Sequence, residues 1–351
     1  MKYDYLVFIG RLQPPTLAHD HVIRTALSLS EKVIIVLGSC NTARTLRNPF
    51  TFAERESMTR SMFSTSEQDR LLFVAQEDYT YQDQKWLVTL QQKVKDQILT
   101  SIPGNNLNVT LHGLLDVRIG LIGHSKDETS YYLSMFPGWA SENVSVVPGV
   151  DATQVRAALF DQVPEQIDLT HVHPAVLAAL AKFAATDAHA TLVEERSFVR
   201  KYQQQWANSP YPPTFVTGLA CVTSSGYVLM IKRAAMPGKG MWALPGGFIN
   251  QHVKILDGVI RGLHEETRIK EPVPVLRGRI VKSGVYDDPH RSSRGRTITH
   301  AYHIKLPNTT TLPKVKGGDD AAEAQWVKLS DLQASECFED HYFVICDLVG
   351  I

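Results

Sequence analysis

Cysteine is scarce in this chain, and its spacing excludes two common kinds of site. The four cysteines form neither a C-x-x-C pair nor a zinc-type pattern, and the thirteen histidines include no H-E-x-x-H motif. Scattered thiols are typical of a reducing compartment, so neither a disulfide framework nor a structural zinc site is expected. Cys221 and Cys346 lie in apolar runs and are predicted to be small core residues.

The chain also lacks a net charge and a long apolar segment. Lys and Arg number 36, as do Asp and Glu, so no overall basic field would attract nucleic acid or an anionic membrane. No apolar stretch reaches the length of a membrane span, and the first residues lead into a strand instead of a signal peptide. We therefore expect a cytoplasmic protein without nucleic-acid or membrane partners. The sequence leaves a homo-oligomer open.

With 351 residues and 44% hydrophobic content, the chain has room for two domains. Its first half alternates short apolar runs with helical stretches, which predicts an α/β domain whose parallel sheet is covered by helices on both faces. Ligands of such sheets bind beyond the carboxyl ends of the strands. The predicted strands are 3–9, 32–38, 71–75, 118–122 and 144–147, and the predicted helices include 18–29, 53–63, 84–99 and 129–136.

A charged helical and proline-rich segment, 186–211, separates this half from the rest. The run Asn208-Ser209-Pro210-Tyr211-Pro212-Pro213 cannot continue a helix, so we place the junction here, with domains at 1–185 and 212–351. Beyond it, short strands surround one helix at 255–267, which predicts an α+β domain. These predicted strands are 215–221, 227–232, 298–306 and 323–328.

The most informative local signal is the turn after the first predicted strand. In Gly10-Arg11-Leu12-Gln13-Pro14-Pro15-Thr16-Leu17-Ala18-His19 an apolar strand ends and a helix carrying His19 begins. Backbone N–H groups at a helix start have no intrahelical partner and carry partial positive charge, so a nucleotide phosphate is the natural occupant. Taken alone, the segment fits an ordinary strand–turn–helix corner equally well.

Three further segments fall at the same predicted sheet edge, and each is weak when taken alone. In the first, Thr51 and Glu54 have the spacing of a capping box. In the last, an Arg stands one helical turn after a Thr. The segments are Asn48-Pro49-Phe50-Thr51 with Glu54 and Arg55 after Arg47, then Gly123-His124-Ser125-Lys126-Asp127, and finally Asp151-Ala152-Thr153-Gln154-Val155-Arg156.

In this order, the four motifs resemble the signature of the nucleotidyltransferases, most closely nicotinamide mononucleotide (NMN) adenylyltransferases of the archaeal type, with Ala18 in place of the usual Gly. The resemblance implies a Rossmann-like domain that joins ATP and NMN into NAD and pyrophosphate, with Mg²⁺ bridging the phosphates. It implies that Trp86 stacks on the nicotinamide ring, although a core position is equally compatible with the sequence. The implied catalytic residues are Arg11, Thr16, His19, Arg47 and Arg156, and the implied substrate contacts are Gly10, Gln13, Asn48, Trp86, Lys126 and Thr153.

A second resemblance begins at Trp242-Ala243-Leu244-Pro245-Gly246-Gly247-Phe248. With Gly247 as the first Gly, the following helix resembles the Nudix box, Gly-x5-Glu-x7-Arg-Glu-U-x-Glu-Glu-x-Gly-U, where U is aliphatic. The box clusters carboxylates because Mg²⁺ prefers oxygen ligands. The resemblance therefore implies Glu265 and Glu266 as metal ligands, and a solvated helix face is the alternative. The matching positions are Arg261, Leu263, Glu265, Glu266 and Ile269.

The box is incomplete. Val253 and Gly262 stand where glutamates belong, and Arg268 stands where a Gly belongs. Gly262 is the serious loss, since the glutamate of that position is normally a metal ligand. A helix-interior Gly also costs about 1 kcal/mol relative to Ala.

Loops after the box are similar to the ADP-ribose pyrophosphatase branch of the Nudix family. They carry Arg291, Arg294 and Arg296, and Gly317-Gly318-Asp319-Asp320-Ala321. Arginine suits bidentate phosphate contact, so the resemblance implies that the three arginines bind ADP-ribose, with a charged loop tip as the alternative.

Together these features predict a fusion of an NMN adenylyltransferase with a Nudix domain that binds ADP-ribose and hydrolyses it weakly. Two alternatives stay open. The second half could be a nucleotide-sensing module that has lost hydrolysis. The first half could be another nucleotidyltransferase, although Arg11-Leu12-Gln13 and the Nudix partner favour the NMN branch.

Overall fold

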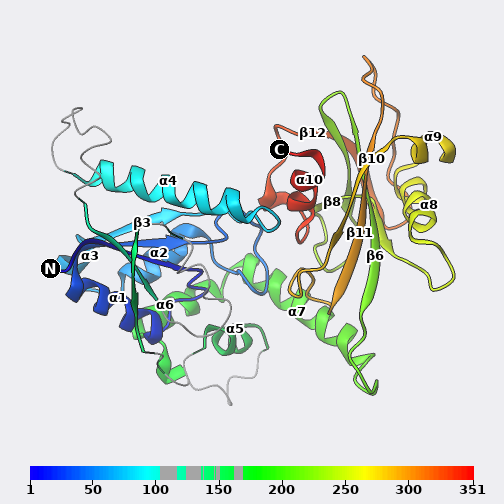
Figure 1. Ribbon diagram of the computed structural model, residues 1–351. Coiled ribbons are helices and arrows are strands. Elements are labelled where there is room, and N and C mark those ends of the chain that lie inside the picture. The colour runs from blue at the N-terminus through cyan, green and yellow to red at the C-terminus, as the bar shows by residue number, and fades with distance from the viewer. Residues whose placement is uncertain (103–116, 124–135, 137, 146, 148–150, 162–168) are drawn as a thin grey trace. The chain divides into compact units, whose positions relative to one another are not determined.

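The computed structural model describes residues 1–102, 117–123, 136, 138–145, 147, 151–161 and 169–351 (Figure 1). The chain forms two compact units, Met1–Val193 and Glu194–Ile351. Each unit has its own sheet and core.

The first unit is built on a parallel sheet of five strands within its described residues. The strand order is β3-β2-β1-β4-β5, with β1 in the middle. This is the doubly wound arrangement that the alternating pattern predicts, and it confirms the Rossmann-like fold class. The strands are β1 (Tyr3–Gly10), β2 (Ser30–Leu37), β3 (Leu71–Ala75), β4 (Ile119–Gly123) and β5 (Ala140–Asn143).

Alternate side chains of β1 face two different cores, because successive residues of a strand point to opposite faces. Leu6 and Phe8 join the core beneath α1, α2 and α6, whereas Tyr5 and Val7 join the core beneath α4. Figure 1 shows α4 on one side of the sheet and α1 and α6 on the other. The helices are α1 (Leu17–Leu29), α2 (Phe52–Arg60), α3 (Thr65–Gln68), α4 (Asp83–Ser101), α5 (Ala152–Asp161) and α6 (Pro174–Phe183).

One predicted strand of this unit is displaced. The ladder with β4 runs over Ala140–Asn143, not over the apolar residues 144–147. Val144 is buried, and its N–H donates to the Gly123 carbonyl as the last bond of the ladder. Val144 therefore marks where the strand enters the core, and the pairing residues precede it. Most of the predicted helix 129–136 lies outside the described residues.

The second unit is a mixed sheet with helices on both faces, which confirms the predicted α+β class. The main path is β10-β11-β6-β7-β12, in which β6 and β11 are parallel and the other neighbours antiparallel. Helix α8 covers one face, and α10 contacts β10 and β11 on the other (Figure 1). The long strands are β6 (Phe215–Ser224), β7 (Tyr227–Arg233), β10 (Ile280–Tyr286), β11 (Thr297–Lys305) and β12 (Ala321–Lys328).

Helix α8 (Ile255–Thr267) has the predicted bounds, because its apolar residues recur at helical spacing. The sequence missed the short elements β8 (Trp242–Ala243), β9 (Gly246–Phe248) and α9 (Val273–Gly278), and also α10 (His341–Val349) and the edge strand β10. On β10 the outward residues Val281 and Val285 are exposed and apolar, so the strand lacks the usual polar–apolar alternation.

The predicted linker is mostly helix. Helix α7 (Asp187–Gln204) covers most of it, and the two compact units divide within α7, between Val193 and Glu194. The first turns of α7 complete the core of the first unit, since Leu192 is buried there and His189 stacks on Phe160. Asn208 and the prolines follow after the helix has ended.

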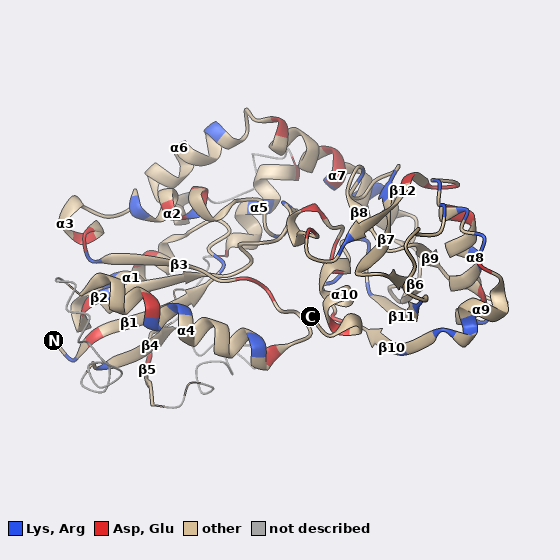
Figure 2. Cartoon of the chain, turned by 90° about the horizontal axis from the view of Figure 1, so that it is seen from above, with Lys and Arg blue, Asp and Glu red and all other residues tan. Residues whose placement is uncertain are grey.

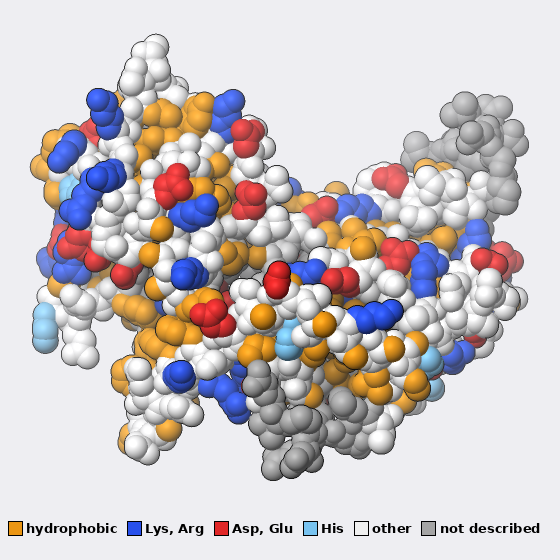
Figure 3. Space-filling view, turned by 180° about the vertical axis from the view of Figure 1, so that it is seen from behind, with side chains coloured by type: hydrophobic (Ala, Val, Ile, Leu, Met, Phe, Trp, Pro, Cys, Tyr) orange, Lys and Arg blue, Asp and Glu red, His pale blue; other side chains and the backbone are white. Residues whose placement is uncertain are grey.

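Lys and Arg alternate with Asp and Glu along both units (Figure 2), and charges of both signs are interspersed over the face seen in Figure 3. Within the described residues, no single helix is long and apolar enough to span a membrane. Helices α6 and α7, which are joined at a bend, reach that length and hydropathy only when the two are counted together.

The packing of α7 predicts that the first unit needs residues beyond its expected end at 185. A fragment ending at Gln204 should be more stable than one ending at Ala185 by at least about 2 kcal/mol, because the shorter one exposes the surface that Leu192 buries. Urea unfolding of both fragments measures the difference. The control is the longer fragment carrying Leu192→Ala, which should lose most of the additional stability. Equal stability of all three fragments would contradict the prediction.

Candidate active sites

The first site begins where β1 ends. Gln13 is buried, and its amide side chain both donates to the Phe50 carbonyl and accepts from the Phe50 N–H, each at 2.9 Å. The backbone carbonyl of Gln13 accepts from Arg156 Nη1 at 2.6 Å. One residue thus connects three of the four sequence motifs, which lie up to 143 positions apart in the chain.

Thr16 is the N-cap of α1, and its pairing with His19 defines the state of the imidazole. The Thr16 N–H donates to Nδ1 of His19 at 3.0 Å, and Thr16 Oγ1 lies 2.9 Å from the same atom. Because Nδ1 accepts a backbone N–H, the neutral ring carries its proton on Nε2. His19 is therefore a hydrogen-bond donor through Nε2 at a helix N-terminus, where anions are favoured.

The second motif forms the capping box that the sequence predicts. The Thr51 N–H donates to Glu54 at 2.8 Å, and the Glu54 N–H donates to Thr51 Oγ1 at 3.3 Å. Glu54 also takes a bidentate ion pair from Arg44 at 2.7 and 2.8 Å. Within the same loop, Asn48 Oδ1 accepts from Arg11 Nη1 at 3.4 Å.

The fourth motif places Arg156 against the first. Besides holding the Gln13 carbonyl, Arg156 donates to Thr153 Oγ1 at 3.1 Å, and the Thr153 N–H donates to Asp151 at 2.8 Å. The predicted Thr–Arg arrangement one helical turn apart is present. Lys126, from the third motif, lies outside the described residues.

Positive charges converge at this edge of the sheet. Arg11 keeps access to solvent, yet its recessed position desolvates the guanidinium and, with repulsion from Arg47 and Arg156, lowers the pKa of Arg11 to about 10. Burial lowers the pKa of Arg156 as well, and the nearby charge of Arg47 adds to this. A cluster of cations with too few counter-charges favours a polyphosphate ligand.

Some functional candidates were not predicted. Asp78, after β3, accepts hydrogen bonds from the side chain and backbone of Ser39, and it faces the charges of Arg11 and Arg47. Burial raises the pKa of Asp78, while these partners oppose the rise. Trp86 packs against the core beneath α4 and is partly buried, so its predicted stacking on nicotinamide stays a prediction.

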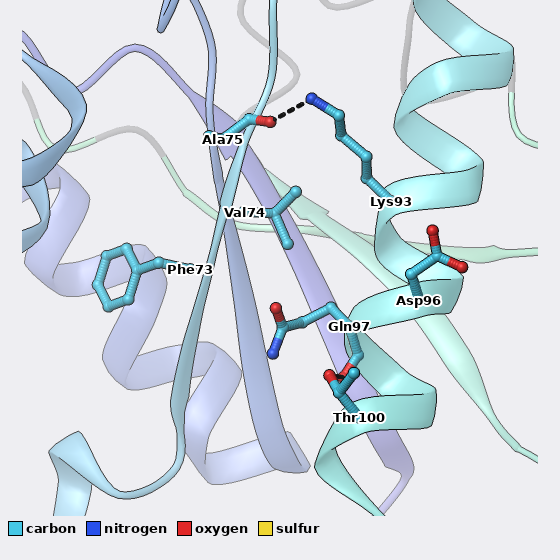
Figure 4. A pocket seen from close by; sticks show the side chains of 7 residues that line it. All are labelled: Phe73, Val74, Ala75, Lys93, Asp96, Gln97 and Thr100. Atoms are coloured by element: carbon cyan, nitrogen blue, oxygen red, sulfur yellow. Dashed lines mark hydrogen bonds between the residues drawn. The ribbon is translucent and has the colours of Figure 1, made fainter.

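A pocket of about 260 Å³ lies between β3 and α4 (Figure 4). Its lining includes Val74, Ala75 and Lys93, and Lys93 Nζ donates to the Ala75 carbonyl at 2.7 Å. None of the predicted site residues lines it, so we assign it no part in the sites described above.

The second site centres on Glu266 of α8. The Gly246 N–H donates to Glu266 Oε2 at 2.8 Å, which ties the helix to the glycine loop of the Nudix box. Burial raises the pKa of Glu266 to about 7, and the charges of Asp319 and Asp320 act in the same direction. Glu265 is half exposed and lies 3.8 Å from Arg261.

The structure shows what the missing glutamate removes. A Cβ added at Gly262 would stand 3.7 Å from Gly246 Cα, an ordinary contact distance, so a side chain has room there. Gly262 and Glu266 lie four residues apart, on one face of α8. A carboxylate at 262 would therefore point to the same loop that Glu266 binds.

The described residues do not form a protein cage for a metal. No group of three or more metal-ligating His, Cys, Asp or Glu side chains occurs among them. Glu265 and Glu266 are adjacent in the helix and differ in exposure, as expected for side chains that do not share a face. Mg²⁺ binding by these two residues stays a prediction.

The three predicted phosphate-binding arginines have different surroundings. Arg291 is buried, forms a bidentate ion pair with Asp340 at 2.7 and 2.9 Å, and also donates to Thr299, so these contacts support a structural role. Arg294 lies 3.8 Å from Glu339, and Arg296 donates to the Asp287 carbonyl at 2.6 Å. They do not form one basic surface.

Two residues that sequence reasoning missed lie close to Arg294. Arg233, at the end of β7, stacks on Phe338 at 4.0 Å, and its pKa is lowered by burial and by Arg294. Burial raises the pKa of Glu339 to about 7, and within the described part of the chain its Oε1 has no hydrogen-bond partner. Neither belongs to a recognisable motif, so no sequence signal marked them.

The comparisons with known proteins match both units. The cytidylyltransferase-like family matches residues 7–103, and the NUDIX domain family matches residues 213–347. A nicotinamide/nicotinic acid mononucleotide adenylyltransferase of Acinetobacter baylyi is 40% identical over 163 residues, 46% of this chain and 77% of the relative. An ADP-ribose pyrophosphatase of Methanocaldococcus jannaschii is 32% identical over 122 residues, 35% of this chain and 65% of the relative.

A solved structure resembles the whole chain. The bifunctional NMN adenylyltransferase/ADP-ribose pyrophosphatase of Francisella tularensis, solved with AMP and a manganese ion, has a TM-score of 0.87 and 32% identity, covering 99% of both chains. Fold and sites thus define a nucleotidyltransferase unit followed by a Nudix unit. The chain belongs to the family of bifunctional NMN adenylyltransferase/ADP-ribose pyrophosphatases.

The third departure from the Nudix box leads to a stability prediction. Arg268 caps α8 in the left-handed conformation, with φ 53°, where the family has Gly. A non-Gly residue in this conformation costs about 1–2 kcal/mol, which Arg268→Gly would remove. Gly also makes the unfolded chain more flexible, which offsets part of that gain. Arg268→Gly should therefore stabilise the protein by about 0.5–1 kcal/mol.

Thermal and urea unfolding test this prediction. The control is Arg261→Gly, an exposed position inside the same helix, which should destabilise by about 1 kcal/mol. A loss of stability in Arg268→Gly would show that the side-chain packing of Arg268 over Gly318 outweighs its backbone strain.

Proposed function

We propose that the first unit transfers the adenylyl group of ATP to NMN, giving NAD and pyrophosphate. The observation that carries this proposal is the convergence of Arg11, Arg156 and the Thr16–His19 pair at the carboxyl end of β1. Ligands of doubly wound sheets bind at this edge. The family relationship supports the same reaction.

The reaction needs no protein nucleophile, because the NMN phosphate attacks the α-phosphate of ATP and pyrophosphate leaves. The protein's part is to align the two phosphates and to stabilise the negative charge that develops. His19 Nε2–H and the N-terminus of α1 donate hydrogen bonds to the triphosphate. Arg11, Arg47 and Arg156 offset its charge, and a divalent metal such as Mg²⁺ would lower the charge further when bound.

This assignment predicts a specific defect for His19→Ala. Loss of one charge-stabilising donor should lower kcat between tenfold and a thousandfold, with a smaller change in KM. NAD formation from Mg-ATP and NMN, followed by chromatography, measures it. His21→Ala, an exposed histidine of the same helix, serves as the control and should keep the wild-type rate. A fully active His19→Ala variant would refute the role of His19.

For the second unit we propose binding of ADP-ribose with weak hydrolysis. Glu266, the glycine loop and Arg294 supply the contacts for a diphosphate, and the relationship to ADP-ribose pyrophosphatases supports the ligand. The weak chemistry follows from Gly262, because fewer carboxylates lower the affinity for the metal that would activate water. A nucleotide-sensing module without hydrolysis is the alternative, favoured by the same glycine.

Restoring the missing glutamate tests this proposal. Gly262→Glu should raise the rate of ADP-ribose hydrolysis at least about tenfold, and Val253→Glu should have a smaller effect. Gly278→Glu, at the end of α9 where a Cβ meets nothing within 4 Å, adds the same charge away from the site and should change nothing. Rapid hydrolysis by the natural protein that Gly262→Glu leaves unchanged would show that other residues hold the metal.

We also propose a cytoplasmic location, because cysteines scattered without C-x-x-C or zinc-type spacing are typical of a reducing compartment.

A further inference from the structure

Arg55 of α2 is a buried cation to which the proposed reaction assigns no part. It is fully buried, and among the described residues no carboxylate forms an ion pair with it. Burial lowers the pKa of Arg55 to about 10, so the side chain keeps its charge at neutral pH. A buried charge without a direct ion pair is costly even with the charges of Asp78 and Glu54 nearby, so its presence calls for an explanation.

The contacts of Arg55 join the ends of two neighbouring strands. Nη1 donates to the carbonyl of Arg11, directly after β1, and to the carbonyl of Gly38, directly after β2, each at 2.7 Å. Nε donates to the Thr51 carbonyl at 3.3 Å, which anchors the guanidinium in its own helix. One planar group therefore bridges both strand ends.

Both carbonyls immediately precede an unusual turn. Leu12 follows Arg11 with φ 47°, and Ser39 follows Gly38 with φ 53°. Residues other than Gly keep such left-handed conformations only where their surroundings hold them. Arg55 is the side chain that holds the carbonyl at the start of each turn.

The two turns carry groups of the proposed site. The first presents the guanidinium of Arg11, and the second presents Ser39, which hydrogen-bonds Asp78 opposite Arg11. Arg55 also contributes to the field at Arg11, because its charge adds to the lowering of the Arg11 pKa. Its Nη2 has no hydrogen-bond partner within the described residues.

We propose that Arg55 is a positioning residue of the adenylyl-transfer site: it fixes the turns after β1 and β2, and its buried charge adds to the field that attracts the substrate phosphates. The inference rests on the proposed adenylyl transfer and deepens it. Arg55 acts through Arg11 and Ser39 and does not itself touch the substrate.

The test compares Arg55→Met, Arg55→Lys and a control, Arg60→Met, in the full chain. Arg60 lies five residues further along α2 and forms an ion pair with Glu56 near the surface. For each variant, kcat and the KM values for ATP and NMN are measured together with the melting temperature. A purely structural role would reduce the melting temperature and the active fraction but leave both KM values unchanged.

Arg55→Met should lower kcat about a hundredfold and raise both KM values about tenfold, because misplaced turns and a lost charge act together. Arg55→Lys keeps the charge but cannot reproduce the planar fork. Its KM values for ATP and NMN should therefore return most of the way to those of the wild type, while its kcat stays about tenfold below the wild-type value. Arg60→Met should keep wild-type kinetics within about twofold.

Wild-type KM values in Arg55→Met, or wild-type kcat and KM in Arg55→Lys, would overturn the inference. The lysine variant decides the matter if the methionine variant does not fold. Failure of the wild-type protein to form NAD from ATP and NMN would instead overturn the proposed function, and this inference with it. An active wild type with unaffected Arg55 variants overturns only the role of Arg55.

Discussion

The adenylyl-transfer site depends on the hydrogen bonds of Gln13. Its side chain is buried and fully paired with the Phe50 backbone, and its carbonyl holds Arg156. Removing this amide would leave the buried polar groups of Phe50 unsatisfied, which costs more than the bonds themselves contribute. Gln13 therefore joins three loops. The arginines on these loops lie close together because Gln13 holds the loops close together.

The two sites differ in their electrostatics. In the first unit, arginines gather beyond the strands with few counter-charges, and the pKa of Arg11 is lowered accordingly. In the second, buried acids and arginines lie together: Arg233 and Arg294 are close to Glu339, yet burial raises the pKa values of Glu266 and Glu339 to about 7. A polyphosphate relieves the first arrangement directly. In the second, burial favours the protonated form of the acids, and the glycine at 262 removes one of the acids that would hold a metal.

The sequence predicted the local geometry around the candidate site of the first unit better than that of the second. Thr16, His19 and Arg156 lie in motifs whose spacing also fixes their local geometry, since a helix start places a capping Thr and an Arg one turn later on one face. Nothing in the sequence marks the buried pairing of Arg291 with Asp340, 49 positions further along the chain, because a basic residue in a loop carries no sign of a distant partner. Binding of ADP-ribose by Arg291 stays a prediction. Arg233 and Glu339 gave no signal at all.

The sequence by itself determined the two fold classes, the first four strands of the first unit and the bounds of α8, because hydrophobic periodicity and capping act over a few residues. The tertiary structure decided the strand order in each sheet, the division of the chain inside α7 and the joining of two strand ends by Arg55. These depend on contacts between residues far apart in the chain, which only the folded packing brings together.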